Sequence, residues 1–127
     1  MVRILLVLVL TGHALAHIPG FLVSWGLATY PELPYRTTVL AGRVEVGATG
    51  IRFLGVVWLL LALSFAGLAA AAFFRAEWAV PGIAAAVVVS LLMSILGWPE
   101  ARVGVLANLL VSGLLFWAIR NGVFQGP

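Results

Sequence analysis

Residues 53–74 read FLGVVWLLLALSFAGLAAAAFF, an uncharged stretch of 22 residues that lies between Arg52 and Arg75. An α-helix of roughly 20 apolar residues crosses the hydrocarbon core of a bilayer, which is about 30 Å thick. The stretch is therefore long enough to cross a membrane as a single helix. Its many alanines, such as Ala62, Ala66 and Ala70 at every fourth position, favour close packing against neighbouring helices.

The charged residues divide the rest of the chain in the same way. Further uncharged stretches of 28, 22 and 17 residues lie at 4–31, 78–99 and 103–119. The charges between them mark where the chain returns to water, so the sequence predicts an all-α membrane protein, a four-transmembrane-helix up-down bundle. We expect one domain, residues 1–127, with helices at about 2–27, 50–74, 79–97 and 102–120 and a long first loop at 28–49.

The composition excludes several classes of protein. Hydrophobic residues make up 64% of the chain and charged residues only 9%, whereas soluble domains carry about 25% charged residues. The net charge of +3 is spread over both ends of the expected helices, which argues against the basic stripe of a nucleic-acid-binding protein. Because the chain has no cysteine, disulfides, thiolate metal sites and cysteine nucleophiles are excluded.

Both ends of the chain resemble processing segments. Arg3, the apolar run after it and Ala14-Leu15-Ala16 fit a cleaved signal peptide. Apolar residues continue from Ile18 to Trp25, however, so we expect the first helix to be retained. Phe124-Gln125-Gly126-Pro127 resembles part of a protease site from an affinity tag, and both a tag remnant and a native end fit this pattern.

The loop at 28–49 contains two short β-prone runs, Thr37–Leu40 and Arg43–Val46. A short β-hairpin between them would form two cross-strand pairs, Val39 with Val44 and Thr38 with Glu45. Ala41 is a poor first residue for a tight hairpin turn, so a hairpin and an irregular loop both fit the sequence. Long loops in small proteins commonly carry specificity.

The arginines give only a slight preference for one orientation. The side that holds both termini has three of them, and the loop side has four, Arg36, Arg43, Arg52 and Arg102. Because the first helix often dominates topology, Arg3 favours cytoplasmic termini under the positive-inside rule. We expect an integral protein of the bacterial inner membrane.

A histidine pair in the first span is the strongest candidate for chemistry. His13 and His17 are four residues apart, which places both rings on one helix face. His13 lies about 15 Å along the helix from Arg3, close to the membrane midplane. Ionisable side chains at this depth are costly and often functional.

Three interpretations of this pair are open: structural hydrogen bonding between helices, contact with a ligand or lipid, and a metal or haem site. The chain has no other His, no Cys and no Asp, and a metal site normally needs a third and fourth ligand. We therefore expect no metal site within one subunit, and His13 and His17 are weak metal candidates. No cofactor follows from the sequence.

Further polar and aromatic residues belong to the same half of the membrane. Asn108 lies about 9 Å beyond Arg102 along the fourth helix, at a depth similar to that of His17. The candidate ligand-binding residues are His13, His17, Trp58, Ser94 and Asn108. The candidate loop lid consists of Tyr35, Glu45 and Arg52. Asn108 and the serines, including Ser90 and Ser94 at every fourth position, also fit a purely structural role in joining helices.

Four short segments resemble an uncharacterised group of short bacterial membrane proteins with four helices. They are Gly12–Phe21, Gly55–Leu59, Ser90–Met93 and Gly97–Gly104 leading to Asn108. Typical features of the group are His-x-x-Gly-Phe in the first helix, Gly-x-x-Trp-Leu in the second and Trp-x-x-Ala-x-x-Gly before an Asn in the fourth. The resemblance implies the fold and the importance of His17, Trp58 and Asn108, and it implies no activity.

The function that we expect is an accessory or binding role in the membrane. The protein would pack within a larger membrane assembly or hold a lipid-like ligand, with membrane lipid and either a second copy of the chain or other membrane subunits as partners. One alternative is a redox enzyme that uses the histidine pair with a metal or haem. Another is an oligomeric small transporter or channel. Without an Asp a Ser-His-Asp arrangement is impossible, so catalysis is the less favoured reading.

Overall fold

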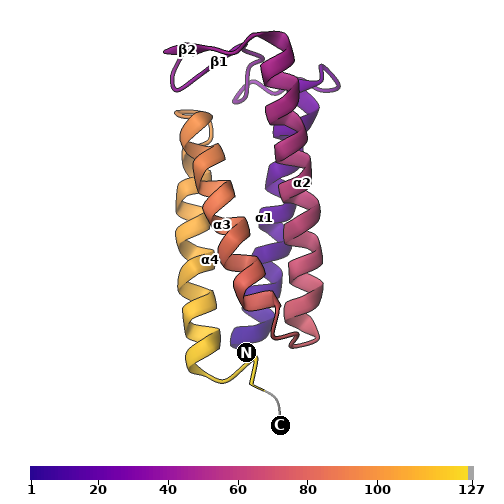
Figure 1. The fold of residues 1–127 in the computed structure, drawn as a ribbon, viewed down its shortest axis with the longest axis vertical. Coiled ribbons are helices and arrows are strands. Elements are labelled where there is room, and N and C mark those ends of the chain that lie inside the picture. Colours follow the sequence, from indigo (N-terminus) through magenta and orange to yellow (C-terminus); the bar gives the residue numbers. More distant parts are fainter. Residues whose placement is uncertain (126–127) are drawn as a thin grey trace.

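The computed structural model describes residues 1–125, and it confirms the predicted all-α bundle. Four helices run up and down in chain order, and a small two-stranded sheet lies in the first connection (Figure 1). All four helices are long and apolar enough to cross a membrane. The elements are α1 (Val2–Ser24), β1 (Thr38–Val39), β2 (Val44–Glu45), α2 (Gly47–Phe73), α3 (Ala79–Leu96) and α4 (Arg102–Arg120).

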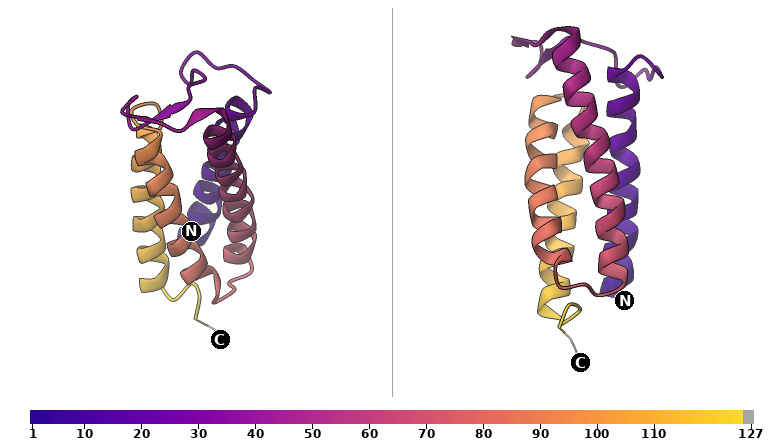
Figure 2. Two further views of the ribbon diagram at one scale, coloured as in Figure 1. Left: turned by 45° about the horizontal axis from the view of Figure 1, so that its top comes forward. Right: turned by 45° about the vertical axis from the view of Figure 1, so that its right-hand side comes forward.

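The helices form two antiparallel pairs, α1 with α2 and α3 with α4, and both termini lie at the same end of the bundle (Figures 1 and 2). The tight α2–α3 turn is at this end, which we call the terminal end. The long connection between α1 and α2 covers the opposite end, which we call the loop end. This arrangement is the up-down topology that the sequence predicts.

The predicted bounds of the first two helices differ from the observed ones. α1 ends at Ser24 instead of about 27, because Gly26 adopts a φ of 67° and the N–H of Leu27 bonds back to the carbonyl of Leu22 at 2.8 Å. α2 begins at Gly47 instead of about 50, where the Glu45 carboxylate accepts the N–H of Gly47 at 2.9 Å. Both bounds lie three residues earlier than predicted, so the connection lies at 25–46 and keeps its predicted length.

Of the two conformations that fit the sequence of the first connection, the structure contains the hairpin, and its register is the expected one, with Thr38 opposite Glu45 and Val39 opposite Val44. Its turn is unusual because Leu40 and Ala41 have φ values of 53° and 56°. Such left-handed backbone in residues other than glycine costs about 1–2 kcal/mol each. The N–H groups of the two residues donate to the carbonyls of Leu96 and Trp98, at 2.8 and 2.9 Å. These bonds satisfy carbonyls at the end of α3 and hold the hairpin on the bundle.

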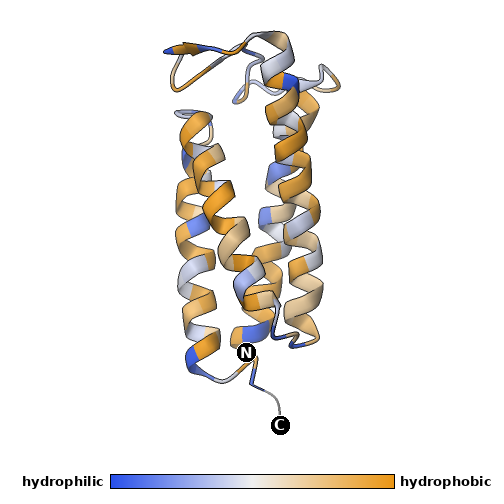
Figure 3. Ribbon diagram, in the orientation of Figure 1, coloured by the Kyte–Doolittle hydropathy of each residue, from blue (hydrophilic) through white to orange (hydrophobic). Residues whose placement is uncertain are grey.

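The hydrophobic core draws on all four helices. Its largest fully buried hydrophobic side chains are Leu6, Leu10, Phe65, Ile83 and Val111. Large hydrophobic side chains also cover the outside of every helix, and polar residues gather mainly at the helix ends (Figure 3). An apolar outer surface of this kind suits lipid. Of the residues that resemble a tag remnant, Phe124 is buried in the core and 126–127 lie outside the described residues.

Candidate functional site

A cluster of polar side chains is buried between α1, α3 and α4. It consists of His13 and His17 from α1, Ser90 from α3 and Asn108 from α4, and we call these four residues the polar cluster. Their exposed fractions are 5%, 2%, 0% and 1% respectively. Each side chain hydrogen-bonds to at least one other member or to the backbone of its own helix. The polar cluster therefore joins three of the four helices.

The hydrogen bonds of Asn108 fix the proton on His13. The Asn108 Nδ2 donates to the carbonyl of Gly104 at 2.8 Å and to Ser90 Oγ at 3.0 Å. A carbonyl can only accept, so the amide nitrogen must face Gly104 and the amide oxygen must face α1. That oxygen lies 3.2 Å from His13 Nε2. His13 must therefore carry its proton on Nε2 and donate it to Asn108.

His17 is held as the opposite tautomer. Its Nδ1 lies 2.6 Å from the carbonyl oxygen of His13, which can only accept, so Nδ1 carries the proton. The bare Nε2 of His17 then accepts the hydroxyl proton of Ser90 at 2.9 Å. The Ser90 hydroxyl thus donates to α1 and accepts from α4, while His13 Nε2 makes a second, longer contact with it at 3.3 Å.

One acceptor in the polar cluster has no partner. With its proton on Nε2, His13 presents a lone pair on Nδ1, and this buried atom makes no hydrogen bond within the described residues. An unpaired acceptor in a low-dielectric interior costs about 1–3 kcal/mol. Such atoms are uncommon in native structures and require an explanation. The lone pair can accept a proton from a hydroxyl or an amine.

Two aromatic side chains of α2 surround the histidines. The ring of Trp58 lies 5.2 Å from that of His17, and the ring of Phe65 lies 4.6 Å from that of His13. Gly20 is required beside the indole, because a Cβ at that position would lie 2.6 Å from Trp58 Cγ. The small residue in α1 thus lets Trp58 reach the polar cluster, close to the loop end.

A pocket of about 280 Å³ opens from the polar cluster between α1 and α4. We call it the lateral pocket. Six of its fourteen lining residues are glycine or alanine: Ala16, Gly20, Gly97, Ala101, Gly104 and Ala107. His13, His17, Trp58 and Ser94 line its inner part. Its exposed members are Ala16 of α1, Val103 of α4 and Glu32 of the loop. The lateral pocket therefore opens between two helices, toward the surroundings of the bundle.

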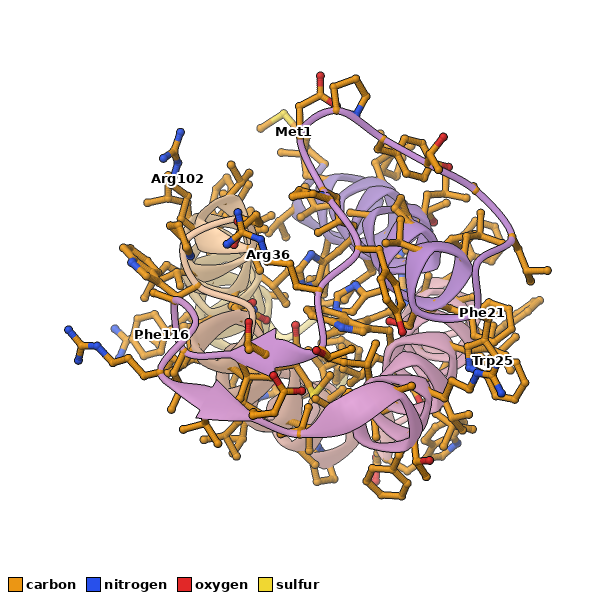
Figure 4. The ribbon with its side chains drawn as sticks, turned by 90° about the horizontal axis from the view of Figure 1, so that it is seen from above. Met1, Phe21, Trp25, Arg36, Arg102 and Phe116 are labelled. Atoms are coloured by element: carbon orange, nitrogen blue, oxygen red, sulfur yellow. The ribbon has the colours of Figure 1, made fainter. Side chains whose placement is uncertain are left out.

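The loop end of the lateral pocket carries charge. Glu32 and Glu100 both contribute to its wall, and Arg36 forms an ion pair with Glu100 at 3.2 Å. Viewed from the loop end, Arg36 reaches over the bundle, whereas Arg102 points away from it (Figure 4). A smaller pocket of about 100 Å³ adjoins this region and is also lined by Trp58 and Glu100.

The structure brings together the five candidate ligand-binding residues and separates the candidate lid. His13, His17, Trp58 and Ser94 line the lateral pocket, and Asn108 hydrogen-bonds to His13 behind it. Of the three lid candidates, Tyr35 lines the smaller pocket. Glu45 instead caps Gly47. The Arg52 guanidinium packs over the ring of Trp25, at the outer edge of the bundle (Figure 4).

Sequence reasoning missed the central role of Ser90. This serine was interpreted as a small packing residue because it recurs with Ser94 at a spacing of four. The hydroxyl of Ser94 bonds only to the carbonyl of Ser90, 2.9 Å away on the same helix. The rotation of α3 about its axis determines which of the two serines reaches the histidines of α1. A single sequence gives little information about this rotation. The sequence also does not predict that Glu32, Arg36 and Glu100 lie at the lateral pocket, because the path of a loop has no periodic sequence pattern.

Metal coordination is weakly supported by this geometry. In the part of the chain that the structure describes, no group of three His, Cys, Asp or Glu side chains could hold a metal ion. Three of the four histidine ring nitrogens are engaged in hydrogen bonds. Only His13 Nδ1 retains a free lone pair, so joint coordination by both rings would require the polar cluster to rearrange.

Comparison with protein-family models, with curated proteins and with solved structures found no match for this chain. The resemblance to short bacterial membrane proteins therefore rests on the short motifs alone. Four helices with the length and apolar character of membrane spans indicate an integral membrane protein.

Proposed function

We propose that this protein is a membrane-embedded binding protein that holds a lipid-like molecule in the lateral pocket. The observation that carries the proposal is the geometry of this pocket. Polar side chains line its inner part, and it opens sideways between α1 and α4, at the depth of the membrane-spanning part of α1. A molecule dissolved in the bilayer could enter between Ala16 and Val103 without leaving the membrane. Mostly apolar pockets with a few convergent polar groups are typical of small-molecule sites.

The polar groups favour a ligand with hydrogen-bond donors. Glu32 and Glu100 offer carboxylates near the loop end of the pocket, and His13, which also lines it, has a buried acceptor without a partner at Nδ1. A hydroxyl- or amine-bearing head group would satisfy these acceptors, while its apolar tail would lie between α1 and α4 beside Ala107. The small side chains of the wall leave room for such a tail.

The alternatives receive less support. A channel needs a polar path through the membrane, and the terminal half of the bundle is filled by fully buried apolar side chains such as Leu6 and Phe65. A redox role for the histidine pair would compete with the hydrogen bonds that fix both rings. An accessory role is compatible with ligand binding, since the apolar outer faces suit a second copy or another membrane subunit as well as lipid.

We further propose the bacterial inner membrane as the location, with the termini on the cytoplasmic side. The motif resemblance supports the first statement. The second is supported by Arg3 at the start of α1, under the positive-inside rule.

Quenching of Trp58 fluorescence tests the binding proposal. The other four tryptophans, Trp25, Trp78, Trp98 and Trp117, are each more than 40% exposed and can be replaced by phenylalanine. Addition of single-chain amphiphiles with a brominated tail and a hydroxyl or amine head should then quench Trp58 in a saturable way.

A matched pair of variants provides the control. Ala107→Phe fills the lateral pocket, whereas Leu106→Phe adds a ring at a neighbouring position that is 67% exposed. We expect saturable quenching in the parent and in Leu106→Phe and its loss in Ala107→Phe. Quenching that never saturates and is equal in all three proteins would contradict the proposal.

A further inference from the structure

A second pocket lies at the terminal end, remote from the polar cluster. It has a volume of about 340 Å³ and is bordered by the start of α1, the α2–α3 turn and the segment that follows α4. We call it the terminal pocket. Arg3 and Arg75 are its two charged side chains, and Asn121 adds an amide. Both termini and the α2–α3 turn lie at this end of the bundle (Figure 1), and lipid head groups surround the ends of a membrane-spanning bundle.

The structure holds the two arginines in place by different means. The Arg3 guanidinium packs over the ring of Phe73, 5.7 Å from its centroid, which keeps it beside the end of α2. Arg75 follows α2 in the left-handed conformation, with a φ of 58°. Glycine is the usual residue at this position after a helix, so an arginine here adopts a backbone conformation that side-chain-bearing residues disfavour.

Within the described residues, no ion pair neutralises the positive charge of the terminal pocket. In residues 1–125, neither Arg3 nor Arg75 has a carboxylate within ion-pair distance. The ion pair found in these residues joins Arg36 to Glu100, at the opposite end of the bundle. Two arginines that line one pocket favour an anion, and arginine suits the oxygens of a phosphate because of its planar fork of donors. Basic pockets between transmembrane helices commonly bind lipid phosphates.

We propose that the terminal pocket binds the phosphate of an anionic phospholipid. Arg3 and Arg75 contact the phosphate oxygens, and the acyl chains lie along the exposed apolar residues Ile4 and Phe73. This site is separate from the lateral pocket and does not depend on the function proposed for it.

Native mass spectrometry of the full chain tests the proposal. The protein is equilibrated in detergent with phosphatidylglycerol or with phosphatidylcholine, and the bound lipid is counted. We expect phosphatidylglycerol to be retained in preference. Each arginine near a membrane surface is worth about 1 kcal/mol toward anionic lipid, so loss of either one should weaken retention about fivefold.

The variants separate charge from folding. Arg75→Gly removes the charge and suits the left-handed backbone, so it should fold as well as the parent. Arg3→Gln provides the second test. Arg120→Gln is the control, because Arg120 belongs to the same end but does not line the terminal pocket. Retention should fall less in Arg120→Gln than in Arg3→Gln or Arg75→Gly, because Arg120 adds only the general attraction of a basic surface for anionic lipid.

Three results would overturn the proposal. The first is equal retention of the two lipids by the parent. The second is a loss in Arg3→Gln and Arg75→Gly that is no larger than in Arg120→Gln. The third is displacement of the lipid by millimolar inorganic phosphate, which would assign the terminal pocket to a soluble phosphate compound.

Discussion

His13 and Asn108 connect α1 to α4 through a hydrogen bond of 3.2 Å between the imidazole Nε2 and the amide oxygen. The direction of this bond is fixed, because the Asn108 amide nitrogen is committed to the carbonyl of Gly104. The free lone pair of His13 is thereby placed on Nδ1, and the residue itself lines the lateral pocket. The pairing of two polar residues in different helices thus sets the chemistry of the lateral pocket.

The two histidines should be opposite tautomers. Nitrogen-15 NMR of histidine-labelled protein in lipid should show His13 protonated on Nε2 and His17 protonated on Nδ1, since a carbonyl oxygen faces each of these atoms. Assignment follows from His13→Gln and His17→Gln, each of which removes one set of signals. The same tautomer in both residues would refute the hydrogen-bond directions described above.

Asn108→Leu should destabilise the bundle by about 1–2 kcal/mol, because His13 Nε2–H loses its acceptor and Ser90 loses a donor. Ser94→Ala should cost at most about 0.5 kcal/mol, since its hydroxyl bonds only within α3. Reversible unfolding in mixed micelles measures both changes. Equal effects of the two substitutions would show that the polar cluster contributes no more than an ordinary serine.

Gly20→Ala should destabilise the protein by about 1–3 kcal/mol, because the added methyl group would displace the ring of Trp58. Gly12→Ala is the matched control on the same helix, since a Cβ there meets no atom within 4 Å. It should be neutral or stabilising by up to about 1 kcal/mol, as expected for alanine in place of a helical glycine. Thermal unfolding of the two variants provides the comparison, and a neutral Gly20→Ala would argue against the close Trp58 contact.

Ala41→Gly should stabilise the hairpin by about 1 kcal/mol, because glycine adopts the observed φ of 56° without strain. Ala41→Pro cannot adopt this φ and lacks the N–H that donates to the carbonyl of Trp98. Hydrogen exchange at Leu40, whose N–H bonds to Leu96, should therefore slow in Ala41→Gly and accelerate in Ala41→Pro. Unchanged exchange in both would mean that the turn does not dock on α3.

The charge pattern made the helices predictable, and the cross-strand pairs of the hairpin followed from its β-prone runs. The pair of His13 and His17 was visible because their spacing places them on one face whatever the other helices do. The role of Ser90 depends on how α3 is rotated about its own axis. Apart from Ser90 and Ser94, α3 is apolar on every face, so hydrophobic periodicity does not predict which face points into the bundle. Arg36 reaches Glu100 through an irregular loop, and local sequence does not encode such a contact.

The amount of lipid-like molecule that remains bound per chain tests the central claim most directly. Gentle purification followed by native mass spectrometry should find one hydroxyl- or amine-bearing amphiphile bound to the parent protein in addition to any anionic phospholipid. The same molecule should remain in Leu106→Phe and be absent from Ala107→Phe, because only the second variant fills the lateral pocket. An Ala107→Phe protein that retains this molecule at the level of the parent would contradict the account.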